Sequence, residues 1–145
     1  MRIRDYMDEI VRGERPGPPV AGTVGMRLVD VADGEATFEL DADPARHSNP
    51  MGTVHGGILC DVADAAMGCA HASLLAEGET FTTLELKMNF LKPVWSGRLT
   101  ARGRVVKSGR TIGLVECDVL DEGGSLVARA SATQMTLRGD AAAGR

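Results

Sequence analysis

Two carboxylates lie in a stretch of the chain that otherwise consists of small and apolar residues. Asp61 and Asp64 sit among Ala, Gly, Val and Met, directly after a His-Gly-Gly turn at His55 to Gly57. Burying an ionised carboxylate is costly unless it is paired, protonated or used by a site. Because perturbed carboxylates in clefts are candidates for acid–base or nucleophilic chemistry, Asp64 is the first candidate catalytic residue. The alternative, a solvated helix carboxylate, fits poorly with its alanine and methionine neighbours.

Asp61 precedes Asp64 by three residues, which places the two on broadly the same side of a helix. In the first turns of that helix a negative charge is favoured by the helix dipole. We therefore interpret Asp61 as a structural or interfacial carboxylate, with catalysis as the less favoured reading.

The His-Gly-Gly turn would supply backbone N–H groups at the start of the same helix. The first N–H groups of a helix have no partner within it, and such donors suit a developing oxyanion. In the alternative interpretation, Gly56 and Gly57 only give the turn its backbone freedom and His55 is structural. Upstream, Asn49 is either a substrate contact or part of a turn, because Asn-Pro is a common turn pair.

Hydrophobic periodicity predicts one long helix set among strands. Residues 25–40 alternate around Asp33-Gly34, which is typical of a hairpin. Residues 56–76 lack Pro and are rich in Ala, Leu and Met, which predicts a helix of about 30 Å with Gly78 as its C-cap. Segments 83–93, 98–107, 111–121 and 125–137 are strand-like, and their short glycine-containing connections favour antiparallel neighbours.

The long helix is small or apolar on every side, which is typical of a buried helix. We therefore expect an α+β fold in which a long, curled antiparallel β-sheet wraps around one central α-helix. Residues 2–11 predict a short amphipathic helix, ended by Pro16, Pro18 and Pro19. The expected organisation is an N-terminal helix and Pro-rich connection over 1–20, the sheet-and-helix domain over 21–138 and a flexible tail over 139–145.

Composition limits the partners and the compartment. Hydrophobic residues make up 43% of the 145-residue chain and charged residues 25%, which indicates a folded single domain. A net charge of −4 argues against nucleic acid as the main partner. We expect no membrane span and no signal peptide, because the longest apolar run contains two Asp and the N-terminus is charged.

The metal-binding residue types give no ligand pattern. Three cysteines, Cys60, Cys69 and Cys117, fit no metal spacing and predict buried thiols in a reducing compartment, hence a cytoplasmic protein. The three histidines also lack nearby acids at ligand spacing, so we expect no metal.

The predicted fold and the motif around Asp64 together resemble the hotdog-fold thioesterases, and most of all the phenylacetate-pathway (PaaI-like) type of acyl-CoA thioesterase. The matching residues are Asn49, the motif GTVHGG at Gly52–Gly57, and Asp64 nine residues after His55. The segments LELKMNFLKPV and VVKSGRTI are similar to the third strand and the later hairpin of that family. The resemblance covers about residues 22–138.

The resemblance implies hydrolysis of an acyl-CoA, with coenzyme A as part of the substrate and no separate cofactor. Asp64 would be the general base or nucleophile, and the Gly56 N–H would polarise the thioester carbonyl. His55, Gly57 and Asn49 would contact the substrate or the attacking group. Dimers that usually pair into tetramers would share the site, with Asn49, His55 and Gly56 from one chain and Asp64 and Thr83 from the other.

Thr83 matches the position where the family often carries a hydroxyl beside the catalytic acid. Simple strand alternation contradicts this placement, because Thr82 rather than Thr83 shares a face with Leu84 and Met88. A β-bulge would reconcile the two.

Lys107, Gly109 and Arg110 lie in a basic hairpin tip that, by resemblance, is near the nucleotide end of coenzyme A. Arg and Lys suit phosphate oxygens; the alternative is a solvated turn. Arg98, Arg102 and Arg104 are interpreted as an exposed strand face.

Two other classes of function remain open from the sequence. One is a hotdog hydratase or dehydratase acting on acyl-CoA or acyl-carrier protein, and the other is a non-catalytic acyl-CoA-binding module. With three Phe, one Tyr and one Trp, the composition does not indicate which acyl group is taken.

Overall fold

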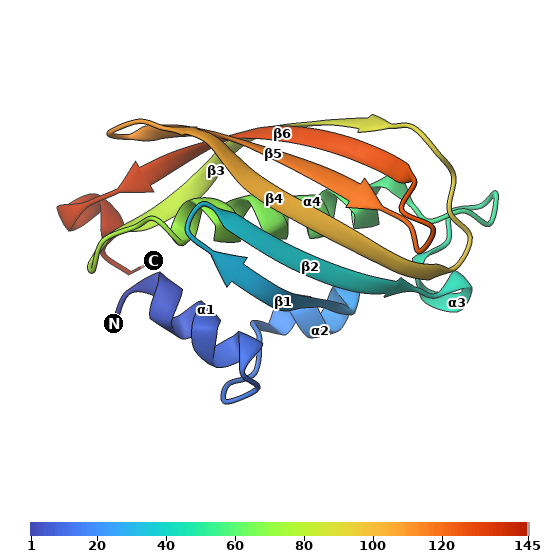
Figure 1. The fold of residues 1–145 in the computed structure, drawn as a ribbon, viewed down its shortest axis with the longest axis horizontal. Helices are drawn as coiled ribbons and strands as arrows, with labels where there is room; N and C mark the ends of the chain where they lie inside the picture. The colour runs from blue at the N-terminus through green and yellow to red at the C-terminus, as the bar shows by residue number, and fades with distance from the viewer. Residues whose placement is uncertain (145) are drawn as a thin grey trace.

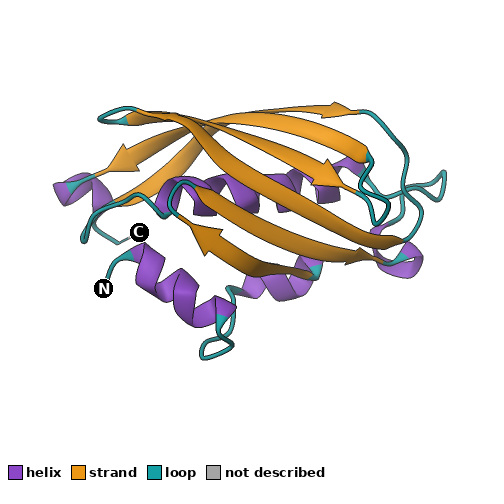
Figure 2. Ribbon diagram, in the orientation of Figure 1, coloured by secondary structure: helices purple, strands orange, loops and turns teal. Residues whose placement is uncertain are grey.

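A single long helix lies across the concave face of one curled sheet (Figures 1 and 2). The computed structural model describes residues 1–144. The six strands are antiparallel in the order β1-β2-β4-β5-β6-β3, and they are β1 Met26–Ala32, β2 Glu35–Ala42, β3 Thr80–Phe90, β4 Gly97–Ser108, β5 Ile112–Leu120 and β6 Leu126–Leu137. The helices are α1 Ile3–Val11, α2 Pro19–Val24, α3 Pro44–His47, α4 Gly56–Ala72 and the 3-10 helix η1 Gly139–Ala142. The predicted hotdog architecture is confirmed.

The central helix α4 approaches the sheet closely because Gly103 of β4 has no side chain. A Cβ atom at Gly103 would lie only 2.4 Å from the Ala66 carbonyl oxygen. Ala66 and Met67, the helix residues at this contact, are fully buried. The missing side chain of Gly103 therefore allows a close approach, and the helix predicted to be buried is fixed against the middle of the sheet.

The predicted C-terminal end of this helix was wrong, because α4 ends at Ala72 and not at residue 76. The Ser73 hydroxyl donates to the Ala70 carbonyl at 2.7 Å and accepts from the Gly34 N–H at 2.8 Å. Ser73 thus ends the helix by docking onto the β1–β2 turn. Gly78 has a positive φ of 81°, but it lies in the following loop and is not the C-cap.

The N-terminal segment contains the predicted helix and one that was not predicted. Helix α1 agrees with the expected range 2–11. In the Pro-rich connection, Pro19 starts the short helix α2, because a proline is tolerated in the first turn, where its missing N–H has no partner to lose. Gly25 ends α2 at a φ of 86°. Helix α2 crosses the predicted boundary at residue 20, and the boundaries and the flexible tail stay predictions.

None of the helices within residues 1–144 combines the length and the apolar character needed to cross a lipid bilayer.

Candidate active site

Asp64 and Thr83 face each other between the central helix and the edge strand β3. The Thr83 hydroxyl donates to Asp64 Oδ1 at 2.9 Å, and both residues are half-buried. A hydroxyl that donates to an ionised carboxylate makes a charge-assisted hydrogen bond, which is stronger than a neutral one. A side chain of the sheet therefore holds the Asp64 carboxylate of α4 through Oδ1, and Oδ2 stays available to another partner.

A β-bulge in strand β3 produces this contact. In the pairing of β3 with β6, Thr83 is opposite Gln134 and Glu85 is opposite Thr133, so one residue of β3 is extra. The side chain of Leu84, between them, is 54% exposed. The bulge that would reconcile the family position of Thr83 with strand alternation is present, and it turns Thr83 toward α4.

Sequence reasoning missed Gln134, which lies behind Thr83. Its side chain is fully buried, and its Oε1 is 3.0 Å from Thr83 Oγ1. Its Nε2 has no hydrogen-bond partner among the described residues. The signal that could have found it is its position on the inward face of β6, in register with the buried Ala130 and Ala132. A polar residue on an otherwise apolar face marks a place where a partner is needed.

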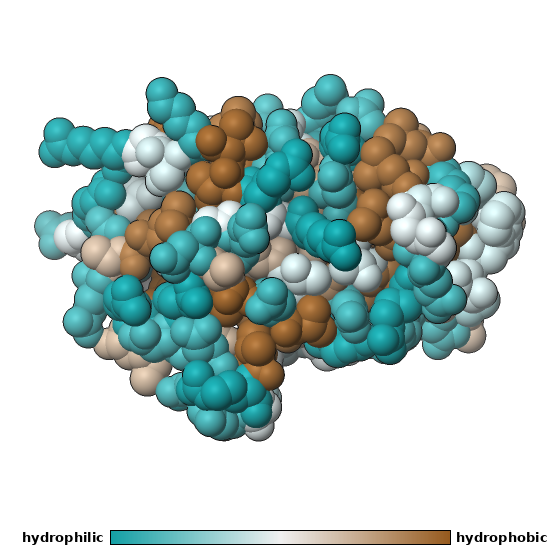
Figure 3. All heavy atoms as spheres, in the orientation of Figure 1, coloured by the Kyte–Doolittle hydropathy of each residue, from teal (hydrophilic) through white to brown (hydrophobic). Residues whose placement is uncertain are grey.

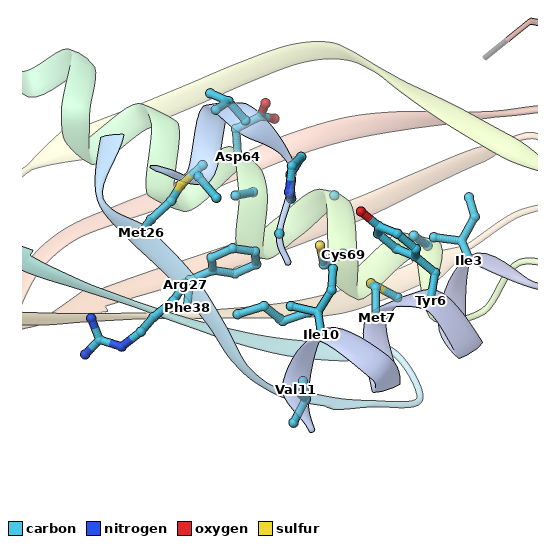
Figure 4. A pocket seen from close by; sticks show the side chains of 18 of the residues that line it. Ile3, Tyr6, Met7, Ile10, Val11, Met26, Arg27, Phe38, Asp64 and Cys69 are labelled. Atoms are coloured by element: carbon cyan, nitrogen blue, oxygen red, sulfur yellow. The ribbon is translucent and has the colours of Figure 1, made fainter. Parts of the chain in front are cut away.

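A cavity of about 970 Å³ opens beside the Asp64–Thr83 pair (Figure 4). Asp61, Asp64 and Thr83 line it together with side chains from α1, α2 and β1. Apart from these groups the lining is mainly apolar. A large apolar cavity with a few convergent polar groups is the usual form of a small-molecule site.

The N-terminus of α4 keeps one free backbone donor. His55 is the N-cap, and its Nδ1 accepts from the Gly57 N–H at 2.8 Å. Among the hydrogen bonds within residues 1–144, none uses the Gly56 N–H. The His55 ring is thus held in place while its residue stays exposed. Of the two glycine N–H groups, the one at Gly56 is available to an acceptor from outside.

The Asn49 side chain is engaged within its own loop. Its Oδ1 accepts from the N–H groups of Met51 and Thr53 at 3.0 and 3.2 Å, and its Nδ2 donates to Thr53 Oγ1 at 2.8 Å. The Asn49 loop lies at the start of α4. Within the same chain, Asp64 follows Gly56 by eight residues, which is about 12 Å along the helix. The chain therefore brings Asp64 and Thr83 together but does not bring Asn49, His55 or Gly56 to them.

The basic hairpin joins β4 to β5 and is solvent-exposed. Lys107, Gly109 and Arg110 are all exposed, and neither cation forms an ion pair among the described residues. Strand pairing aligns Ser108, Gly113, Gln134 and Thr83 in one row across the sheet. Three strand spacings separate the tip from Thr83, about 14 Å.

The arginines on the outer face of β4 behave as the sequence predicted. Arg98, Arg102 and Arg104 are all exposed. Arg98 pairs with Asp41 at 3.0 Å, and Arg104 pairs with Glu116 at 2.6 Å. The outer face of β4 is therefore an exposed, charged strand face.

The cysteines are poor nucleophiles. Burial raises the pKa of Cys69 to about 12 and that of Cys117 to about 12, with nearby carboxylates adding to the effect. Burial and then Asp61 and Asp64 raise the pKa of Cys60 as well. Because the thiolate is the reactive form, none of these thiols is activated at neutral pH.

Two of the histidines have structural partners. His47 is buried; its Nδ1 accepts from the Asp43 N–H at 3.0 Å, and its Nε2 is 2.7 Å from the Val24 carbonyl oxygen. His71 Nε2 is 3.0 Å from Thr136 Oγ1. Within the described residues, no group of three His, Cys, Asp or Glu side chains is arranged to hold a metal ion.

Known proteins share both the sequence pattern and the fold. The profile of the Thioesterase superfamily matches residues 51–128. A phenylacetic acid degradation-related protein from Ralstonia eutropha JMP134 is 35% identical, with a TM-score of 0.81, over 90% of this chain and 98% of that one. A thioesterase family protein from Silicibacter pomeroyi is 33% identical, with a TM-score of 0.80, over 92% of this chain and 99% of that one.

A curated relative carries a named activity. The 1,4-dihydroxy-2-naphthoyl-CoA hydrolase of Listeria monocytogenes is 28% identical over 69% of this chain and 80% of its own length. With the matched fold and motif, these comparisons show that the chain belongs to the thioesterase superfamily, in its hotdog-fold, phenylacetate-pathway branch. It is a thioester hydrolase, as the resemblance implied.

Proposed function

We propose that the protein hydrolyses the thioester of an acyl-coenzyme A, with Asp64 as the reacting carboxylate. The observation that carries this proposal is the Asp64 carboxylate, held by the Thr83 hydroxyl at 2.9 Å and lining an apolar cavity of about 970 Å³. Coenzyme A as the carrier is supported by the relative named for hydrolysis of an aryl-CoA. The free cations of the basic hairpin suit its phosphates.

Asp64 has two possible roles, and the geometry accommodates both. As a general base it takes a proton from a water molecule whose oxygen attacks the thioester carbonyl carbon. The tetrahedral intermediate then expels the thiolate of coenzyme A, which receives the proton back. As a nucleophile, Asp64 attacks the carbonyl itself and releases the thiolate, leaving a mixed anhydride that water hydrolyses. In both routes the oxygen of the thioester carbonyl becomes negatively charged.

The donor for that oxygen is proposed to come from a second copy of the chain. The free Gly56 N–H lies about 12 Å along α4 from Asp64 of the same chain, too far to contact one thioester. Edge strand β3 carries the exposed apolar residues Leu84 and Phe90, which are 54% and 56% exposed. Pairing of β3 with its symmetry mate would cover these side chains and extend the sheet.

A homodimer is thus the smallest active unit in this proposal, and a further face is available for a homotetramer. Val106, Ile112 and Leu114 on β4 and β5 are 51%, 46% and 44% exposed. Figure 3 shows apolar groups interrupting the otherwise hydrophilic surface on the face drawn. We place the protein in the cytoplasm, because its thiols are unpaired and a reducing compartment keeps them so.

The Asp64→Asn variant tests the proposed chemistry. It should lower kcat for acyl-CoA hydrolysis by about 100-fold or more, because acid–base assistance contributes that much. Asp61→Asn is the matched control, since it removes a carboxylate from the same face of α4, and it should retain most of the activity. Near-normal kcat in folded Asp64→Asn, or a larger loss in Asp61→Asn, would overturn the assignment.

Mixing two inactive variants tests the shared site. The Asp64→Asn homodimer lacks the reacting carboxylate of every site, and the Asn49→Ala homodimer changes the loop that, by the family resemblance, completes the partner's site together with Gly56. A mixed dimer regains one intact site, so statistical exchange of subunits should restore about a quarter of the wild-type activity. No recovery on mixing, despite subunit exchange seen by mass spectrometry, would place the whole site within one chain.

A further inference from the structure

The wall of the cavity that faces α4 is built by the N-terminal segment. Side chains of Ile3, Tyr6, Met7 and Ile10 from α1, with Pro19 and Ala21 of α2, line it. Figure 4 shows the labelled α1 side chains gathered at the cavity to which α4 contributes Asp64 and Cys69. This segment precedes residues 51–128, which match the superfamily profile. The wall therefore comes from a part of the chain that lies outside the profile match.

The opposite wall is a single stripe of α4. The cavity is lined at helical spacing by Asp61, Asp64, Ala65, Gly68, Cys69 and Ala72. Asp61 and Ala72 are eleven residues apart, so the stripe is about 16 Å long. Asp64 lies near one end of it. A thioester carbonyl beside Asp64 would thus leave most of the stripe to the acyl group.

The two cations at the cavity are already compensated. Arg15 pairs with Glu9 at 2.6 Å, and Arg27 pairs with Glu39 at 2.7 Å and with Asp41 at 3.1 Å. The groups along the stripe beyond Asp64 are Ala, Gly and a thiol whose pKa is raised to about 12 by burial. A polar or charged acyl group would lose hydration along this stripe without gaining a partner from α4. An apolar acyl group has no such hydration to lose, so this stripe favours it.

We propose that residues 3–22 form the outer wall of the acyl pocket, and that the substrate carries a long apolar chain of the fatty-acyl class. The proposal rests on the function assigned above, because it places the thioester at Asp64. A cavity of about 970 Å³ is at the upper end of the range, about 300–1,000 Å³, that holds drug-sized ligands. Its length along α4 favours an extended chain over a compact aryl group.

Filling the cavity from α1 tests the proposal. Burial of one methylene contributes about a fourfold increase in kcat/KM. Wild-type kcat/KM should therefore rise from butanoyl-CoA through octanoyl-CoA to dodecanoyl-CoA. Ile10→Trp should lower the value for dodecanoyl-CoA by about 10-fold or more and leave butanoyl-CoA nearly unchanged. Tyr6→Ala, which enlarges the cavity, should move the preference toward longer chains.

The control is Thr23→Trp, because Thr23 is an exposed residue of α2 that does not line the cavity. It should leave the chain-length profile unchanged. A loss in Ile10→Trp that is equal for all chain lengths, with an unaltered melting temperature, would overturn the proposal. So would a wild-type preference for benzoyl-CoA or phenylacetyl-CoA over dodecanoyl-CoA.

Binding separates failure of this proposal from failure of the proposed chemistry. The dodecyl thioether of N-acetylcysteamine cannot be hydrolysed and has no nucleotide, so calorimetry with it reports on the cavity alone. Wild type and Asp64→Asn should bind it, and Ile10→Trp should bind it about 10-fold more weakly. Binding without turnover of any acyl-CoA would leave the pocket assignment standing and remove the function, whereas turnover with no chain-length dependence in either assay would do the reverse.

Discussion

The Thr83 hydroxyl lies 2.9 Å from Asp64 Oδ1, and it connects the edge strand of the sheet to the central helix at the one point where β3 is bulged. Without the extra residue, Thr82 would face the helix instead. A hydroxyl at this position fixes the direction of one carboxylate oxygen. The bulge is therefore part of the candidate site and not an accident of strand pairing.

Replacing Thr83 tests this relationship. Thr83→Val keeps the shape of the side chain but removes the donor, and a hydrogen bond to a charged group is worth about 1.5–3 kcal/mol. We expect kcat to fall about 10-fold to 100-fold while KM changes little. Thr83→Ser is the matched control and should retain most of the activity. Equal activity of the Val and Ser variants in steady-state assays would show that the hydroxyl does not position Asp64.

We expect Gln134 to decide which of two acceptors receives the hydrogen bond from the Thr83 hydroxyl. The hydroxyl has one hydrogen and two acceptors in reach, Asp64 Oδ1 at 2.9 Å and Gln134 Oε1 at 3.0 Å, while Gln134 Nε2 has no partner in the described part of the chain. If the Gln134 amide is rotated by about 180°, its Nε2 donates a hydrogen bond to Thr83 Oγ1. The Thr83 hydroxyl then donates its own proton to Asp64. Gln134→Met should then lower kcat about 5-fold to 10-fold at every pH, since a typical hydrogen bond is worth about 1 kcal/mol.

Gln134→Glu distinguishes this positioning role from a packing role. A buried carboxyl group has a raised pKa and stays neutral at moderate pH, so it can donate to Thr83 as the amide does. When it ionises at higher pH, it competes with Asp64 for the hydroxyl proton. The pH–kcat profile of this variant should approach wild type at low pH and fall on the alkaline side. A profile parallel to that of wild type would mean that Gln134 only fills space.

The sheet was predictable from the sequence because one face of each strand is buried and alternation records that face. The same alternation conflicted with the family position of Thr83, and the conflict itself indicated the bulge. The end of α4 was not predictable, because Ser73 docks onto Gly34, which is 39 residues away. Helix α2 was missed because its prolines were treated only as helix breakers, although Pro19 is in the first turn.

The candidate site was only partly predictable for a related reason. The family resemblance placed Thr83 beside Asp64, but Gln134 has no motif and comes to the site through the pairing of β6 with β3. The cavity is also a product of tertiary structure, since α1 is far from α4 in the sequence. Amphipathicity predicted that α1 has an apolar face, but not that this face borders a cavity.

His71 should make the fold sensitive to mild acid. Burial lowers its pKa below the usual value, and the nearby Glu79 offsets this only in part. As the pH falls below about 6.5, the unfolded chain takes up a proton that folded His71 does not. The free energy of unfolding should therefore decrease as the pH falls from about 6.5 toward the pKa of the folded state.

Urea unfolding between pH 7.5 and 5.5 measures this effect. His71→Gln cannot titrate, so its stability should change less across the interval, although it is lower throughout because the contact with Thr136 is altered. Carboxylates whose pKa is lowered by ion pairs, such as Asp118 beside Arg129, lose their contribution only in more acidic solution, as the pH falls through their folded pKa. An equal loss of stability in wild type and His71→Gln would assign the acid sensitivity to other groups.

The basic hairpin separates recognition from chemistry. If Lys107 and Arg110 bind the nucleotide phosphates, their contacts are equal in the ground and transition states, so they affect KM and leave kcat alone. Replacing both by Ala should raise KM for an acyl-CoA about 10-fold or more, with each exposed contact worth about 1 kcal/mol, and the loss should be larger at low salt. Arg12→Ala with Arg102→Ala is the control, because it removes two exposed charges elsewhere.

An acyl-N-acetylcysteamine thioester, which lacks the nucleotide, should be hydrolysed equally well by wild type and by the hairpin variant. An equal loss with both substrates would show that the hairpin supports the fold or the reacting groups, since Ser108 is aligned with Thr83 across the sheet. No loss with either substrate would mean that coenzyme A is held elsewhere on the protein or is not the carrier. The two substrates and the two double variants therefore decide whether the free cations of the tip recognise phosphate.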